Sequence, residues 1–138
     1  MNILSNEVVK EAKKRLGDNP SLQRLWEEIE KLQRLYESQT ESKLWKRVDL
    51  QSREGQELIK RTVFCLAEEL FELTNALKNR PWTQTQYETD IPRLLDELAD
   101  ATIFLIILAH QLGLDAETFL EIVMRKIIVN EWRVETGY

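Results

Sequence analysis

Apolar residues recur every three or four positions along almost the whole chain, and few residues interrupt this pattern. Such spacing places side chains on one side of an α-helix, whereas a half-buried strand alternates at every second residue. Only four glycines and three prolines occur among the 138 residues, so the chain holds few of the residues that end helices. No convincing strand or internal repeat is visible. The sequence therefore predicts an all-α fold.

Caps and helix-breaking residues divide the chain into five expected helices. These run from about Ser5 to Gly17, from Pro20 to near Thr40, from Asp49 or Ser52 to before Pro81, from Asp90 to about His110, and from Asp115 almost to Gly137. A loop is expected at 80–89. Because the connections are short, we expect neighbouring helices to run antiparallel. The length suits one domain, 1–138, an antiparallel bundle with residues 1–19 as an N-terminal helix extension.

Charge and composition exclude several kinds of partner. The net charge of −5 gives no general attraction for phosphate backbones, so we expect no nucleic-acid partner. A single cysteine, Cys65, and a charged N-terminal segment favour a cytoplasmic location without a signal peptide. The longest apolar stretch, 101–109, is far below the roughly 20 residues of a membrane span, so no membrane partner is expected. Since the fourth helix is apolar nearly all round, we expect a homodimer or homotetramer.

Two pairs of acidic residues have the spacing of neighbours on a helix. Glu69 and Glu72 lie three apart, as do Glu97 and Asp100, so each pair shares one side of its helix. Two such pairs on facing helices would form a cage of carboxylate oxygens, the ligands that Mg²⁺ prefers. The alternative is that these acids form an ordinary solvated helix face.

The fourth helix favours the metal site. The side that carries Glu97 and Asp100 continues, one turn later, into the apolar residues Ile103, Phe104 and Ile107. A purely solvated face would stay polar, so part of the acidic cluster should enter the interior, where like charges need a cation. On the third helix the main apolar stripe lies opposite Glu69 and Glu72, so that helix alone does not indicate a buried site.

A second polar group occupies the last helix. Lys126, Asn130 and Arg133 follow at intervals of four and three residues and share their side with apolar residues. They are candidate donors to phosphate oxygens, or cations that extend from a core edge into solvent. The usual glycine-rich phosphate loops are absent, and His110 and Cys65 fit structural positions better than catalytic ones.

Three motifs together resemble the all-α nucleoside triphosphate pyrophosphohydrolases, the group that contains MazG-like enzymes and dimeric dUTPases. They are the Glu-Glu-x-x-Glu motif at 68–72, the Glu-x-x-Asp motif at 97–100, and KIIVNEWRVETGY at 126–138. The last is similar to the end of dimeric dUTPases, which tend to carry Lys-x-x-x-Asn-x-x-Arg-x-x-x-Gly-Tyr. The resemblance covers roughly residues 22–138.

The resemblance implies a reaction and a set of site residues. Glu69, Glu72, Glu97 and Asp100 would coordinate Mg²⁺, with Mn²⁺ as a substitute, and Glu69, less so Glu68, would orient the attacking water. The phosphates would contact Lys126, Asn130 and Arg133. The products would be a nucleoside monophosphate and pyrophosphate, with dUTP as the favoured substrate. The alternative substrates are purine deoxynucleotides such as dGTP or dATP. The alternative function is that of a non-enzymatic helical interaction protein.

The nucleoside would be held by residues outside the acidic motifs. Gln33, in a run that resembles the leucine-glutamine motif of the dimeric dUTPases, and Tyr138 of the C-terminal motif are implied by the resemblance. Trp45 and Trp82 are candidates to stack on a base, or else to cover the core. Tyr36 and Ile103 stand where those dUTPases usually carry asparagine and histidine, so the preferred base stays open.

Overall fold

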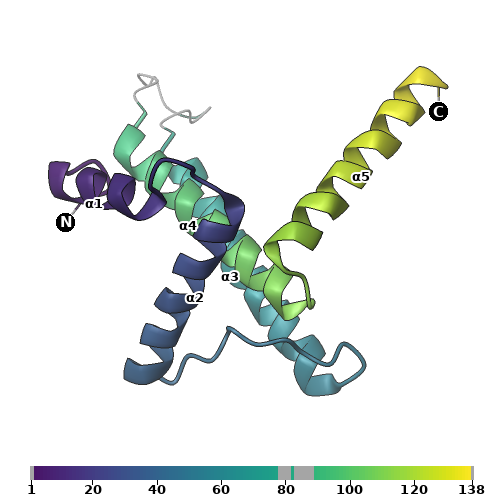
Figure 1. Ribbon diagram of the computed structural model, residues 1–138, viewed down its shortest axis with the longest axis horizontal. Helices are drawn as coiled ribbons and strands as arrows, with labels where there is room; N and C mark the ends of the chain where they lie inside the picture. The colour runs from purple at the N-terminus through teal and green to yellow at the C-terminus, as the bar shows by residue number, and fades with distance from the viewer. Residues whose placement is uncertain (1, 78–81, 83–88, 138) are drawn as a thin grey trace.

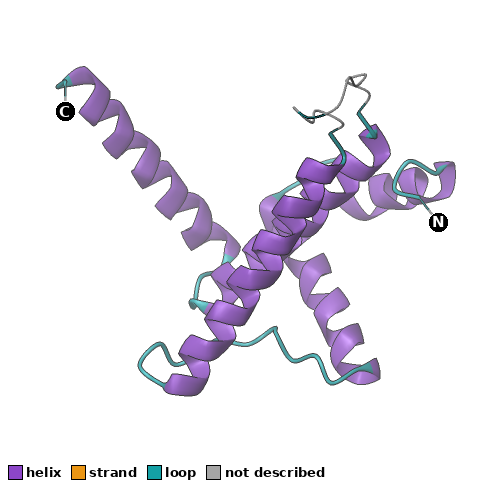
Figure 2. Cartoon of the chain, turned by 180° about the vertical axis from the view of Figure 1, so that it is seen from behind, coloured by secondary structure: helices purple, strands orange, loops and turns teal. Residues whose placement is uncertain are grey.

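The computed structural model describes residues 2–77, 82 and 89–137, and within these ranges it contains five α-helices and no strand (Figures 1 and 2). The helices are α1 (Asn6–Leu16), α2 (Leu22–Gln39), α3 (Arg53–Asn75), α4 (Ile91–Gln111) and α5 (Ala116–Glu135). The all-α prediction is confirmed. Most of the loop expected at 80–89 lies outside the described residues.

Side-chain caps explain where most of the helices begin. The Ser52 hydroxyl accepts a hydrogen bond from the Gly55 amide, and the Asp90 carboxylate accepts one from the Arg93 amide. At α5, Asp115 and Thr118 form a reciprocal capping box. The start expected at Pro20 is wrong: Ser21 caps α2, accepting from the Arg24 amide, and the helix begins after it. A serine cap satisfies an N-terminal amide of the helix, which Pro20 cannot do.

α3 and α4 form an antiparallel pair that runs side by side in both ribbon views (Figures 1 and 2). α2 crosses this pair and contacts α4 near the C-terminal end of α4, where most of the core lies. The buried core residues there are Trp26, Ile29, Trp45, Ile106, Ile107, Ala109 and Ala116. Burial of these apolar side chains is the main stabilising contribution that the described residues offer.

The segment between α2 and α3 is fastened to the end of α4. The Gln111 side-chain amide donates to the Leu44 carbonyl, and the Gln111 carbonyl accepts from the Val48 amide. Next to these bonds, the Trp45 ring stacks on His110 at 3.8 Å between centroids. Burial lowers the pKa of His110 and so favours the neutral imidazole in this stack. His110 therefore has a structural position.

α5 leaves the rest of the fold after its first turn. Ala116 is buried and Phe119 packs on Trp26 at 5.9 Å between centroids, whereas the remaining helix extends away (Figure 1). Between α4 and α5 the chain bends by 101°, so α5 does not return antiparallel along α4 as the short connection predicted. Gly113 lies in this bend with φ of +87°, a backbone conformation that residues with a side chain rarely adopt.

None of the described helices is by itself long and apolar enough to span a membrane. α4 and α5 meet that criterion only when taken together across their bend.

Candidate metal centre and adjoining cavity

The antiparallel pairing of α3 and α4 brings three acidic side chains together. Glu69 comes from α3, and Glu97 and Asp100 come from successive turns of α4. One carboxylate oxygen from each lies within 4.8 Å of the others. Such a set of hard oxygen donors, contributed by two helices, can hold a divalent cation of the Mg²⁺ type. The sequence-based expectation that the Glu97 side enters the interior agrees with this geometry, because Glu97 is only 8% exposed.

The three carboxyl groups are too close to be ionised together without cost. Burial, a hydrogen bond that the protonated Glu69 carboxyl donates to Glu97, and the nearby charges of Asp100, Glu72 and Glu97 raise the pKa of Glu69 to about 7. Burial and the charges of Asp96 and Glu97 raise the pKa of Asp100. A divalent cation at this position would relieve the repulsion, so the donor set fits such an ion.

Arg93 is the one cation that the described residues place against the cluster. Its Nε lies 3.7 Å from a Glu97 carboxylate oxygen, one helical turn earlier on α4. Arg93 was not among the residues predicted from the sequence, although its spacing of four residues from Glu97 is that of an ion pair on a helix.

The other acidic residues of the Glu-Glu-x-x-Glu motif lie beside the cluster. Glu72 is exposed one turn after Glu69 and acts on it through its charge, but it is not among the three closely spaced carboxylates. Glu68 is exposed on α3 and contributes to raising the pKa of Cys65. Of the three acidic residues in this motif, only Glu69 therefore belongs to the close cluster with Glu97 and Asp100.

A cavity of about 270 Å³ adjoins the acidic cluster, with Asp100 in its wall. It lies between α2, the segment after it and α4, and its remaining lining residues are Leu32, Gln33, Tyr36, Ser42, Leu44, Ile103, Phe104 and Ile107. Gln33 is only 5% exposed, and its side-chain amide makes no hydrogen bond within the described part of the chain. An amide that lines a cavity without a hydrogen bond of its own is suited to bind a polar ligand there.

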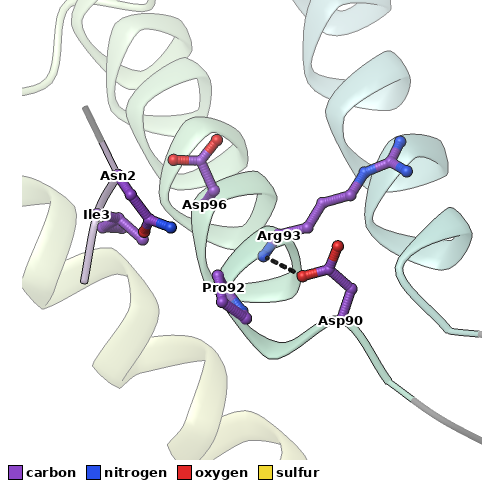
Figure 3. A pocket seen from close by; sticks show the side chains of 6 residues that line it. All are labelled: Asn2, Ile3, Asp90, Pro92, Arg93 and Asp96. Carbon is purple, nitrogen blue, oxygen red and sulfur yellow. Dashed lines mark hydrogen bonds between the residues drawn. The ribbon is translucent and has the colours of Figure 1, made fainter. Parts of the chain in front are cut away.

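A second cavity, of about 320 Å³, lies at the N-terminal end of α4 (Figure 3). Polar and apolar residues line it together, and the Asp90 carboxylate there already accepts a hydrogen bond from the Arg93 amide as the cap of α4. Figure 3 shows the Arg93 side chain pointing away from Asp96 and Asn2. This cavity offers no buried polar group without a partner, so the Gln33 cavity is the better candidate site.

The aromatic candidates for base stacking are placed differently from Gln33. Trp45 is buried, stacks on His110 and contacts Trp26 edge-on, so its ring is part of the core and does not line the cavity. Trp82 is 75% exposed, and the residues on both sides of it are not described. Tyr138 lies outside the described residues.

The candidate phosphate donors stand apart from the acidic cluster. Lys126, Asn130 and Arg133 lie on the part of α5 that extends away from the fold, whereas the cluster lies between α3 and α4 (Figure 1). α5 contacts α2 but has no extended contact with either helix of the cluster. One copy of the chain therefore does not bring the donors and the acids together.

No protein-family model, curated protein or solved structure matches this chain. The sequence and structure themselves show an all-α protein of five helices with an acidic cluster that could hold a metal ion.

Proposed function

We propose that the chain is a Mg²⁺-dependent nucleoside triphosphate pyrophosphohydrolase that releases a nucleoside monophosphate and pyrophosphate. The observation that carries the proposal is the juxtaposition of the Glu69, Glu97 and Asp100 carboxylates with a cavity lined by the buried Gln33 amide. An ion site beside an apolar cavity suits a substrate with a charged phosphate end and a flat base. The resemblance of the three motifs to the all-α pyrophosphohydrolases supports the same reaction.

The acidic cluster would hold the metal ion through Glu69, Glu97 and Asp100, with Mn²⁺ as a substitute. When bound, such an ion neutralises phosphate oxygens and lowers the pKa of coordinated water. Glu69 is the member of the cluster that comes from α3, and we assign it the role of orienting the water that attacks the α-phosphorus. Glu72 and Glu68 add negative charge at the edge of the same site.

The cavity would hold the nucleoside. The Gln33 amide has one acceptor and two donors, so it can pair with the adjacent carbonyl and N–H groups of a uracil ring. Leu32, Phe104 and Ile107 would pack on the faces of the base. The same amide can also pair with purine edges, so dUTP is favoured by the C-terminal motif, and dGTP or dATP is the alternative.

A product assay tests the proposal. The purified chain, with Mg²⁺ or Mn²⁺, is incubated with a panel of deoxynucleoside triphosphates, and the products are separated. We expect pyrophosphate and a monophosphate, fastest from dUTP. Release of orthophosphate and a nucleoside diphosphate would instead show cleavage of the outer anhydride, and no hydrolysis of any nucleotide would refute the enzyme.

Three variants of α4 locate the activity. Glu97→Gln and Asp100→Asn each remove a carboxylate from the cluster, and we expect at least a hundredfold loss of kcat, the scale of removing a group that stabilises transition-state charge. Asp96→Asn is the matched control, because it removes the same charge from an exposed position of the same helix. Equal effects of all three substitutions would contradict a site built on Glu97 and Asp100.

A further inference from the structure

Arg93 lies on the same side of α4 as two members of the acidic cluster. Residues 93, 97 and 100 follow at intervals of four and three, so Arg93, Glu97 and Asp100 form one row along the helix. The ion pair between Arg93 Nε and Glu97, at 3.7 Å, places the guanidinium beside the cluster. Figure 3 shows this side chain directed away from Asp96. The row therefore carries a cation next to the carboxylates that would hold the metal.

The row has a fixed order along α4. It continues from Asp100 to Phe104 and Ile107, which line the cavity assigned to the nucleoside. An interval of seven residues advances about 10 Å along a helix, so Arg93 and the cavity lie on opposite sides of the cluster. A nucleotide whose base enters the cavity and whose α-phosphate meets the metal would thus direct its β- and γ-phosphates toward Arg93.

The Arg93 guanidinium keeps donors for a further acceptor. Its contact with Glu97 is longer than a hydrogen bond, and its side chain makes no hydrogen bond within the described part of the chain. The side chain is also 44% exposed, so a ligand can reach it. A guanidinium presents its N–H donors as a planar fork that matches two phosphate oxygens. Arg93 is therefore equipped to bind phosphate.

The charges of the site call for a cation at this position. Three carboxylates carry more negative charge than one divalent ion neutralises, and a triphosphate adds several negative charges. Such a substrate needs cationic donors at the phosphate oxygens that the metal does not bind. Arg93 is the cation that the described residues place against the cluster, whereas Lys126 lies on the part of α5 that extends away (Figure 1).

We propose that Arg93 binds the β- and γ-phosphates of the substrate, which leave together as pyrophosphate. Arg93 thereby makes the site selective for triphosphates over monophosphates. This inference rests on the proposed function, from which it takes its substrate. Once Glu97 serves as a metal ligand, it no longer needs Arg93 as its counter-charge, and the guanidinium can pair with phosphate oxygens instead.

Isothermal titration calorimetry of the full chain in the presence of Mg²⁺ tests this role without turnover. The two probes are pyrophosphate, which represents the outer phosphates, and dUMP, which carries only the inner phosphate. For Arg93→Gln we expect pyrophosphate to bind about tenfold more weakly or worse, the scale of a hydrogen bond to a charged group, and dUMP to bind as before. Arg93→Lys should fall between the two, because lysine keeps the charge and loses the fork.

Two controls separate phosphate binding from a structural role. Arg125→Gln removes the same charge and an ion pair with a glutamate four residues away, Glu121, and should leave pyrophosphate affinity unchanged. Titration with Mg²⁺ alone should show the same or a higher affinity in Arg93→Gln, because the substitution removes a competing cation. The Arg93 amide, not its side chain, bonds to the cap Asp90, so the start of α4 should persist, which circular dichroism checks.

Three results would overturn the role of Arg93. They are a wild type that does not bind pyrophosphate, an Arg93→Gln chain that binds it as tightly as the wild type, and an equal loss of affinity for pyrophosphate, dUMP and Mg²⁺. A wild type that binds pyrophosphate through Arg93 but hydrolyses no nucleotide would refute the proposed reaction and leave the phosphate site standing. The two failures are thus distinguishable.

Discussion

Glu69 lies close to the carboxyl groups of Glu97 and Asp100. Its titration should therefore change the free energy of unfolding with pH. Its pKa is about 7 in the folded chain against an ordinary 4.5, so the folded state holds a proton that the unfolded state has lost between these values. The stability that this group contributes is complete at low pH and is lost as the pH rises through 7.

Glu69→Gln should therefore be more stable than the wild type above pH 7 and equal to it below pH 4.5. Because the side chain is partly exposed, we expect about 1 kcal/mol, or about 4 °C in Tm, at pH 8 without metal. Thermal unfolding by circular dichroism, at one protein concentration and with a chelator, measures this difference. Mg²⁺ should raise the Tm of the wild type and not that of the variant. A difference that does not change with pH would contradict the crowding of these carboxyls.

Gln33 offers a separate test of the cavity. Gln33→Leu replaces an amide that makes no hydrogen bond with the described residues by an apolar side chain of similar size, so stability should stay equal or rise by about 1 kcal/mol. If the amide binds the base, KM for the preferred nucleotide should rise about tenfold, the effect of one hydrogen bond. Urea unfolding and steady-state kinetics measure the two quantities. An unchanged KM would exclude Gln33 from the nucleoside site.

Part of this site could be predicted from the sequence. The polar-to-apolar transition on α4 correctly indicated that Glu97 is buried, because burial follows helical periodicity. Glu69 was harder to interpret, since the main apolar stripe of α3 lies away from its side of the helix, and its position next to Glu97 and Asp100 depends on how α3 pairs with α4. The stacking of Trp45 on His110 depends on a contact between distant segments, which periodicity does not report.

At the level of helices, the capping residues in the sequence predicted where most helices begin, but not the direction in which α5 runs. The caps Ser52, Asp90 and Asp115 were identifiable because a capping side chain bonds to amides within three residues of itself. The direction of α5 was not, because it depends on the bend at Gly113 and on the anchoring of Phe119 against Trp26. Such contacts join residues far apart in the sequence.

The segment between α2 and α3 provides a prediction at this level. Gln111 is fully buried, and its side chain donates to the Leu44 carbonyl at 2.9 Å. Gln111→Leu leaves that carbonyl without its donor, so we expect a loss of about 1–3 kcal/mol in the free energy of unfolding. Urea denaturation measures it, and Gln56→Leu, which removes a similar bond to the Leu50 carbonyl at an exposed position, is the control. Equal losses in the two variants would show that burial of the Gln111 bond is unimportant.

At the scale of the whole molecule, the two halves of the proposed site lie on parts of the chain that do not meet within one copy. The acids lie between α3 and α4, and Lys126, Asn130 and Arg133 lie on the extended α5. If α5 packs on α3 of another copy, it carries these donors toward the helix that holds Glu69. The proposed reaction would then need a second copy of the chain to complete each site.

Mixed oligomers test whether each site combines two copies. Glu97→Gln removes the metal site and Lys126→Ala removes a phosphate donor, so each variant alone should be nearly inactive. In a mixed dimer, one site would carry both defects and the other would carry none. Co-expression of the two variants should therefore restore about a quarter of wild-type activity, since half of the dimers are mixed and each has one intact site. If acids and donors act within one copy, the mixture will show no more activity than the two variants measured separately, although sedimentation finds the same oligomer.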